Sequence, residues 1–230
     1  MFYNSTYLLC MGPAFLLMML AQWYVSSTYN RWSRVPLRVG MTGAEVVEYL
    51  ARQAGLMIRI EPVEGLLTDH YDPRSKTLRL SRKNYFGRSV AAAAVAAHEF
   101  GHALQDASQY RPLVLRSAMV PVVNFGSYLG WIFLMAGLFF RLTSLAWLGV
   151  LFFAGGAAFA LVTLPVEFDA SARAKRLLEQ TGILRSETEK QGVSKVLTAA
   201  ALTYVAAFAV ALSQLLYYVL LVLGMTSRRR

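Results

Sequence analysis

Four long apolar runs alternate with two polar segments along this chain of 230 residues. A helix needs about 20 apolar residues to cross a bilayer, and each run is near or above that length. The interiors of the runs lack Asp, Glu, Lys, Arg and His, apart from Arg116 near one end. The pattern predicts an α-helical polytopic membrane protein with about four spans. These are residues 8–25, 113–140, 144–164 and 196–224.

The first polar segment, residues 28–112, is too long for a plain loop, and we expect it to fold as a small α+β domain. Thr42-Gly-Ala-Glu45 is a capping box, in which the Thr hydroxyl accepts from the Glu amide while the Glu carboxylate reaches back. It predicts a helix that Gly55 closes. Ser89 is a further N-cap candidate and is expected to open a second helix.

Three stretches between these helices have the character of strands. Residues 56–61 alternate apolar and polar side chains, and residues 66–71 and 77–81 are two further candidates. Asp-Pro-Arg-Ser-Lys at residues 72–76 has the composition of a turn. The segment is therefore predicted to contain a short β-hairpin or a three-stranded sheet.

The helix after Ser89 contains the motif His-Glu-x-x-His. On a helix, residues i and i+4 lie on one face, so His98 and His102 can hold one metal ion together. Glu99 lies beside that face and can act as general base, as in zinc peptidases. The alternative is a helix with two surface histidines, but the residues before His98 are small and apolar. The motif therefore predicts a catalytic Zn²⁺ site.

A catalytic zinc takes three protein ligands, so a third must come from the same side of the membrane. His70 is one candidate, whereas Cys10 lies on the wrong element. Glu167 stands out in the second polar segment, residues 165–195. Pro165 suits the first turn of a new helix, where a carboxylate is electrostatically favoured. The alternative for Glu167 is an interfacial carboxylate or a helix-start charge.

The combination of motifs resembles a known family. His98-Glu-Phe-Gly-His102 followed by Glu167-Phe-Asp-Ala170, with residues 67–74 and 78–81 before them, is similar to the YugP-like neutral membrane zinc metallopeptidases, which are gluzincins. The resemblance implies His98, His102 and Glu167 as zinc ligands and Glu99 as base.

The sequence departs from this pattern at one position. Related membrane gluzincins have Asp directly after the E-x-x-A motif, whereas Ser171 follows Ala170 here and Asp169 comes earlier. Which carboxylate orients a ligand histidine is therefore open.

Several residues are candidates for supporting roles. A ligand histidine usually donates its second N–H to a carboxylate or carbonyl, and Asp169, with Asp106 behind it, is the candidate partner. His70, Tyr85 and Arg173 are candidate donors to the tetrahedral oxyanion. For each the alternative is an exposed strand, loop or surface residue. The open edge of the hairpin could pair with an extended peptide, or the hairpin could simply cover the helix.

The distribution of charge predicts orientation. The formal net charge is +10, and the two polar segments with their borders hold 13 and six Lys and Arg, against four elsewhere. Positive residues favour the cytoplasmic side, so we expect a multi-pass protein of a bacterial inner membrane with its active site facing the cytoplasm. The first run is expected to be an uncleaved anchor, because Arg31 follows it. The terminal Arg-Arg-Arg, residues 228–230, disagrees with this orientation.

The expected partners are a peptide or membrane-protein substrate and the lipid bilayer. No basic patch resembles a nucleic-acid module, and small residues in the spans permit a homo-oligomer or a membrane-protein partner. The leading hypothesis is a zinc endopeptidase acting on membrane-proximal or unfolded substrates. The alternatives are a non-enzymatic membrane scaffold or adaptor with a structural or degenerate zinc site, and a transporter, which would carry ionisable residues inside its spans.

Overall fold

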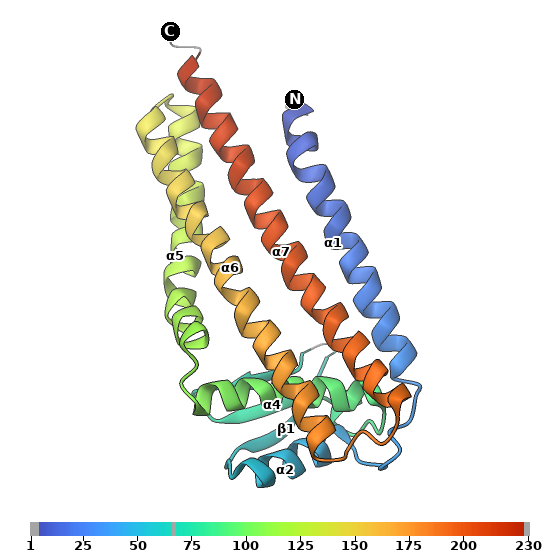
Figure 1. Ribbon diagram of the computed structural model, residues 1–230. Helices are drawn as coiled ribbons and strands as arrows, with labels where there is room; N and C mark the ends of the chain where they lie inside the picture. Colours follow the sequence, from blue (N-terminus) through green and yellow to red (C-terminus); the bar gives the residue numbers. More distant parts are fainter. Residues whose placement is uncertain (1–4, 66–67, 228–230) are drawn as a thin grey trace. The chain divides into compact units, whose positions relative to one another are not determined.

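The computed structural model describes residues 5–65 and 68–227. It is mostly helical, with four candidate membrane-spanning helices and a small three-stranded sheet (Figure 1). This confirms the predicted combination of helical spans and a short sheet. The spanning helices are α1 (Ser5–Trp32), α5 (Arg111–Phe139), α6 (Thr143–Gln180) and α7 (Glu187–Ser227).

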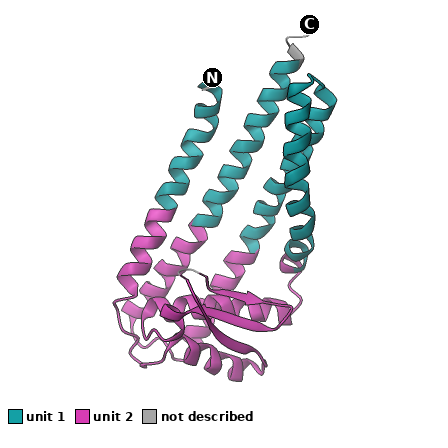
Figure 2. Ribbon diagram, turned by 180° about the vertical axis from the view of Figure 1, so that it is seen from behind, with its two compact units in different colours: residues 1–21, 114–165, 203–230 teal, residues 22–113, 166–202 magenta. Residues whose placement is uncertain are grey.

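The chain divides into two compact units (Figure 2). Unit 1 consists of Met1–Ala21, Val114–Pro165 and Thr203–Arg230, and unit 2 consists of Gln22–Leu113 and Val166–Leu202. Helices α1, α5, α6 and α7 contribute residues to both units. The polar segments, with the short helices and the sheet, belong to unit 2.

Helix α6 corrects the prediction that a new helix starts at Pro165. The helix is continuous from Thr143 to Gln180 and contains this proline in its interior. A proline removes one backbone hydrogen bond from a helix, and the rest of a long, packed helix can compensate for that loss. Glu167 therefore lies within a helix, and a helix-start dipole does not explain its position.

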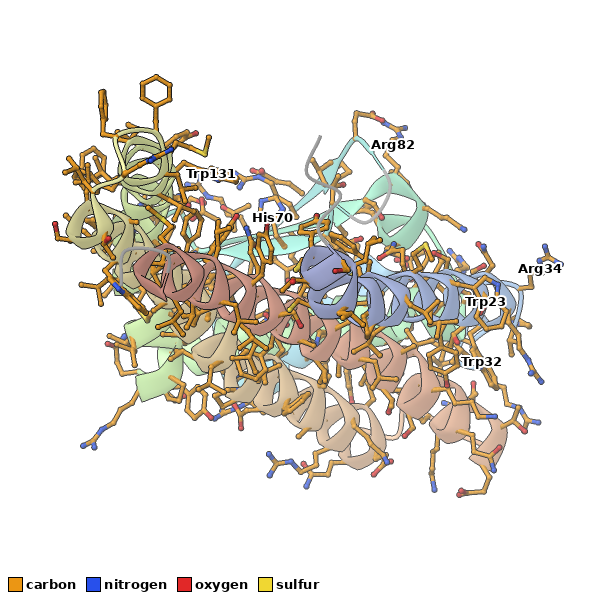
Figure 3. All side chains as sticks on the ribbon, turned by 90° about the horizontal axis from the view of Figure 1, so that it is seen from above. Trp23, Trp32, Arg34, His70, Arg82 and Trp131 are labelled. Carbon is orange, nitrogen blue, oxygen red and sulfur yellow. The ribbon has the colours of Figure 1, made fainter. Side chains whose placement is uncertain are left out.

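Unit 1 is held together by close helix contacts and aromatic pairs. Gly149 of α6 lies so near Leu134 of α5 that an added Cβ would be 2.6 Å from the Leu134 nitrogen. Trp131 of α5, labelled in Figure 3, contacts the rings of Phe153 and Tyr218. Gly149 thus permits close packing of α5 and α6. Gly155 and Gly156 meet nothing within 4 Å and do not have this role in the described residues.

The first helix of unit 2 is α2 (Gly43–Ala54), and its ends are those expected from the sequence. The Thr42 hydroxyl accepts from the Glu45 amide, and the Glu45 carboxylate accepts from the Thr42 amide, which confirms the capping box. Gly55 closes the helix with a φ of 64°, a left-handed conformation that glycine adopts without strain.

The sheet contains β1 (Arg59–Val63), β2 (His70–Asp72) and β3 (Thr77–Ser81) in the order β1-β3-β2. Strands β2 and β3 form the predicted antiparallel hairpin, and β1 pairs parallel to β3. The first strand starts later than the predicted residue 56, because the amide of Leu56 donates to Ala51 and completes the end of α2. The predicted strand at residues 66–71 includes residues 66 and 67, which lie outside the described part of the chain.

Helix α4 (Val90–Ala107) follows the short helix α3 (Arg82–Tyr85) and lies at the centre of unit 2 (Figure 1). The Ser89 hydroxyl accepts from the Ala92 amide, which confirms the predicted N-cap. The alanine-rich first half of α4 is buried, and the helix contacts α2, α3 and the strands β2 and β3. Because alanines allow close approach, this helix forms the core of unit 2 and positions the motif that follows on the same helix.

Candidate metal centre

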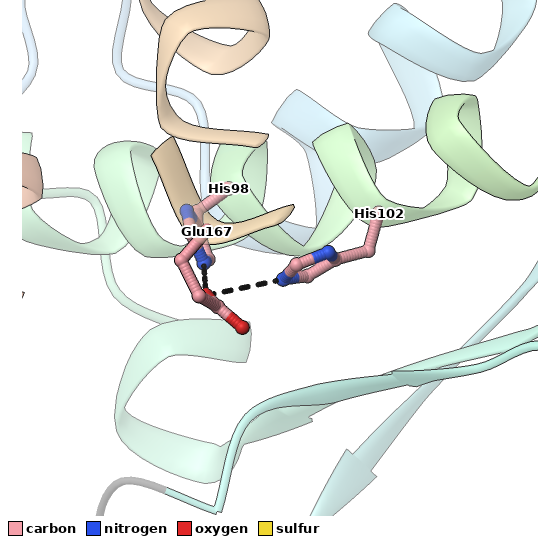
Figure 4. Close-up of side chains that lie close together, drawn as sticks. All are labelled: His98, His102 and Glu167. Carbon is pink, nitrogen blue, oxygen red and sulfur yellow. Dashed lines mark hydrogen bonds and ion pairs between the residues drawn. The ribbon is translucent and has the colours of Figure 1, made fainter. Parts of the chain in front are cut away.

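Two histidines of α4 and one glutamate of α6 converge within unit 2 (Figure 4). Nε2 of His98 lies 3.2 Å from Oε2 of Glu167, and Nε2 of His102 lies 3.5 Å from the same oxygen. One ligand atom from each of the three residues falls within 4.8 Å of the others. Among the described residues, this is the cluster of His, Cys, Asp and Glu that could hold a metal ion.

The donor set fits a zinc ion. Ligand atoms about 2.0–2.2 Å from a tetrahedral zinc lie about 3.3–3.6 Å from one another, and the distances of 3.2 and 3.5 Å match that spacing. The side chain of Glu167 is only 2% exposed, and a buried carboxylate needs a compensating positive charge. Two imidazoles and one carboxylate also leave a fourth tetrahedral position open for water or substrate.

The electrostatics of the three residues show how strongly they interact. Burial lowers the pKa of His102, but the hydrogen bond to Glu167 and the charge of Glu99 outweigh it, and the pKa ends above its ordinary value. Burial would raise the pKa of Glu167, but the hydrogen bonds from His102 and His98 hold that pKa well below its usual range. A positive charge placed between the three side chains is therefore electrostatically favourable.

The two ligand-bearing helices cross at their smallest residues. A Cβ added to Gly101, inside the histidine motif, would lie 2.6 Å from the carbonyl oxygen of Ala170 on α6. Ala170 is itself fully buried. The sequence alone predicts no role for Gly101. Because both residues are small, α4 and α6 approach closely enough for Glu167 to reach the two histidines.

Ser171 contacts the first histidine of the motif. Nδ1 of His98 lies 3.1 Å from the Ser171 hydroxyl oxygen. This is the position at which the sequence departs from related gluzincins, and the structure places a neutral hydroxyl rather than a carboxylate against the ring.

Gln105 contacts the second histidine and was missed in the sequence analysis. Its Oε1 lies 2.9 Å from Nδ1 of His102, and its Nε2 donates to Val166 O at 2.8 Å and to Asp169 Oδ2 at 2.9 Å. The side chain is completely buried. Asp169, the predicted partner of a ligand histidine, therefore contacts His102 only through this amide. The spacing of three residues between His102 and Gln105 is the signal that could have identified it.

The remaining candidates lie elsewhere in unit 2. Asp106 is not a histidine partner: its carboxylate accepts from Tyr71 at 2.8 Å and from Lys76 at 2.6 Å, which attaches the hairpin to α4. Burial, and then the hydrogen bond to Asp106, raise the pKa of Tyr71. Arg173 donates through Nε to Asp169 at 2.6 Å.

Two further candidates, His70 and Tyr85, do not belong to the metal cluster. His70 is exposed on β2, and its Nδ1 contacts Thr68 O at 2.8 Å (Figure 3). Strand alternation puts His70 on the face opposite to Tyr71, whose hydroxyl reaches α4. Tyr85 belongs to α3 and contacts the ring of Phe86.

Glu99 lies on α4 between the two histidines and is 9% exposed. Its charge acts on His102, which places the carboxylate close to the cluster. A partly accessible carboxylate in this position can exchange a proton with a water molecule at the cluster.

Comparisons with known proteins also point to a zinc peptidase, and the matches cover nearly the whole chain. A family model described as "Putative neutral zinc metallopeptidase" matches residues 7–223. The "Putative membrane protease YugP" of Bacillus subtilis (strain 168) is 45% identical over 205 residues, which cover 89% of this chain and 91% of that protein. No solved structure matches the chain. The family match includes the histidine motif, its partner glutamate and most or all of each candidate spanning helix, and the chain therefore belongs to the putative neutral zinc metallopeptidase family.

Proposed function

We propose that this protein is an integral-membrane zinc endopeptidase that hydrolyses peptide bonds of membrane-proximal or unfolded substrates. The observation that carries the proposal is the convergence of two imidazoles and one carboxylate, with ligand atoms within 4.8 Å, around a helix that also bears Glu99. His98, His102 and Glu167 hold the zinc ion. Bound there, zinc supplies a Lewis acid that polarises the scissile carbonyl and acidifies water.

The chain's own residues then manage the proton. Glu99 accepts a proton from the attacking water and passes it to the leaving amine, as a general base and then a general acid. Its low exposure of 9% limits competing contacts with bulk water. Ser171 and Gln105 hold the rings of the two histidines at their Nδ1 atoms.

We further propose that the domain is zincin-like and that substrate binds in extended form at the β2 edge of the sheet. Strand β3 is central in the order β1-β3-β2, so β2 is an edge strand. The hairpin is attached to α4 through Asp106. A peptide that added to this edge would run beside the helix that carries the histidine motif and would be recognised through its backbone.

The contacts in unit 2 bear on which residue donates a hydrogen bond to the oxyanion. Arg173 donates through Nε to Asp169, and the other N–H groups of its guanidinium stay candidate donors to a reacting carbonyl. We keep Tyr85 as a candidate donor, whereas His70 lies on the face of β2 opposite to the side that reaches α4.

The proposed location is a bacterial inner membrane, with unit 2 on the cytoplasmic side. The support is the excess of Lys and Arg in the two polar segments, which together with the bordering Arg116 hold 19 of the 23. Labelling of cysteines introduced at exposed positions of α2, from each side of sealed vesicles, tests this orientation.

The decisive experiment compares purified wild type with the Glu99→Gln variant for zinc content and for cleavage of an unfolded reporter protein. We expect Glu99→Gln to retain zinc and to lose activity by roughly 10²- to 10⁴-fold, because general acid–base catalysis is lost. Glu48→Gln, the same change at an exposed position of α2, is the matched control and should behave as wild type. Equal activity in wild type and Glu99→Gln would refute the mechanism. Stoichiometric zinc without cleavage by wild type would instead support the scaffold with a structural zinc site.

A further inference from the structure

We infer that Gln105 is a positioning residue: its buried amide fixes the tautomer of His102 and ties that ring to the backbone of the helix carrying Glu167. The inference rests on the proposed zinc peptidase function and assigns a role that neither the motif nor the family match provides. It follows from the hydrogen-bonding capacity of each atom around one side chain.

The orientation of the amide is determined by its two partners on α6. Gln105 Nε2 lies 2.8 Å from the carbonyl oxygen of Val166 and 2.9 Å from Oδ2 of Asp169. A carbonyl oxygen only accepts, and so does an ionised carboxylate, here one that also accepts from Arg173 at 2.6 Å. The NH₂ group must therefore face α6. Because the side chain is 0% exposed, solvent does not offer it other partners.

The position of the amide oxygen then determines the tautomer. Gln105 Oε1 faces Nδ1 of His102 at 2.9 Å, and an amide oxygen can only accept. His102 must therefore carry a proton on Nδ1. This leaves Nε2 as the nitrogen that can ligate a metal, and Nε2 is the atom on the side of Glu167, at 3.5 Å from its Oε2.

The contact at the other histidine does not have this property. Ser171 lies 3.1 Å from Nδ1 of His98, and a hydroxyl can either donate or accept. Ser171 is therefore compatible with both tautomers of His98. Among the described contacts at Nδ1 of the two rings, only the one to Gln105 has a fixed polarity.

The same amide also links ring and ligand. Val166 is the residue before Glu167, so one buried group bonds both to a ligand histidine and to the backbone beside the ligand glutamate. Metal-bound histidines often bond to a carboxylate instead. Here the carboxylate of Asp169 lies one group further away, and Arg173 balances its charge.

Two substitutions separate the roles of the amide. Gln105→Met has a similar length and removes every polar contact, whereas Gln105→Glu keeps an acceptor for His102 and loses both donors to α6. Gln53→Met, the same change at an exposed position of α2, is the matched control. In the full-length protein in detergent, chelator competition should show zinc affinity about 10- to 100-fold weaker in both Gln105 variants and unchanged in Gln53→Met.

The tautomer is read by ¹⁵N NMR of histidine-labelled, metal-free protein, where zinc does not itself select the tautomer and three histidines give a simple spectrum. We expect a protonated Nδ1 for His102 in wild type and in Gln105→Glu, and its loss or mixing in Gln105→Met. Reduced packing alone would not make the two variants differ in this signal.

Either of two results would overturn the inference. One is an unprotonated Nδ1 of His102 in the metal-free wild type, a measurement that does not depend on whether any variant folds. The other is a Gln105→Met variant with wild-type zinc affinity and an unchanged signal. A wild type that binds no zinc would refute the proposed function itself, so the two failures are distinguishable.

Discussion

The close crossing of α4 and α6 at Gly101 predicts how far the two helices must move apart when this glycine is replaced by alanine. In Gly101→Ala, the new Cβ would lie 2.6 Å from the carbonyl oxygen of Ala170, whereas ordinary contact begins at 3.4 Å. The helices must therefore separate by the difference of about 0.8 Å. Metal ligands tolerate deviations of about 0.2 Å, so the shift is about four times what a zinc site accepts.

We therefore expect Gly101→Ala to lose zinc affinity by at least 10- to 100-fold, roughly the range found when the surroundings of metal ligands are changed. The effect on stability should be smaller, because overpacking costs about 1–3 kcal/mol while alanine is about 1 kcal/mol better than glycine in a helix. Zinc competition and thermal unfolding of the metal-free protein measure the two effects separately.

The matched control is Gly155→Ala in α6, because a Cβ added to Gly155 meets nothing within 4 Å. This variant should bind zinc as wild type does. If Gly101→Ala also bound zinc with wild-type affinity, a close crossing of α4 and α6 would not be what brings Glu167 to the histidines, and the reasoning would be refuted.

Three further predictions concern other parts of unit 2. Glu167→Ala should weaken zinc binding beyond the roughly 10- to 100-fold typical of changes outside the ligands, and full zinc occupancy would exclude it as a ligand. Asp106→Ala should destabilise the protein by about 1.5–3 kcal/mol in chemical unfolding, because the hydrogen bond from Tyr71 to a charged group is lost; an unchanged midpoint would argue against this anchor. The bond from the Thr42 amide lowers the pKa of Glu45 from 4.5, so Glu45 stabilises the fold above that pH and less below it. The stability difference between wild type and Glu45→Gln should therefore shrink as the pH falls below 4.5 and through the lower pKa of Glu45 in the folded protein, and a constant difference would contradict the sign.

The features predicted correctly from sequence are those that local spacing decides. The capping box at Thr42, the left-handed Gly55 and the N-cap at Ser89 each depend on residues within one helical turn. The same is true of His98 and His102, which share a face because they are four residues apart.

The features that were missed depend on contacts between distant segments. A proline signal is ambiguous, because packing decides whether a helix ends there or, as in α6, continues through Pro165. Asp106 and Asp169 are both carboxylates near the motif, and only the fold shows that Asp106 holds Tyr71 while Asp169 holds Gln105. No periodicity in the sequence distinguishes these two partners.

The charges around the cluster indicate the charge of the ion that it should hold. Glu167 is buried, and Glu99 is close enough for its charge to act on His102, so the site gathers two carboxylates with little solvent. The groups that contact the two rings at Nδ1 are a neutral amide and a neutral hydroxyl. With neutral imidazoles the site therefore carries two negative charges, and like charges at short range are costly when they are buried. A divalent cation balances this count without additional groups, whereas a monovalent ion would leave one charge unpaired. The charge balance thus supports a divalent cation on grounds independent of the ligand spacing.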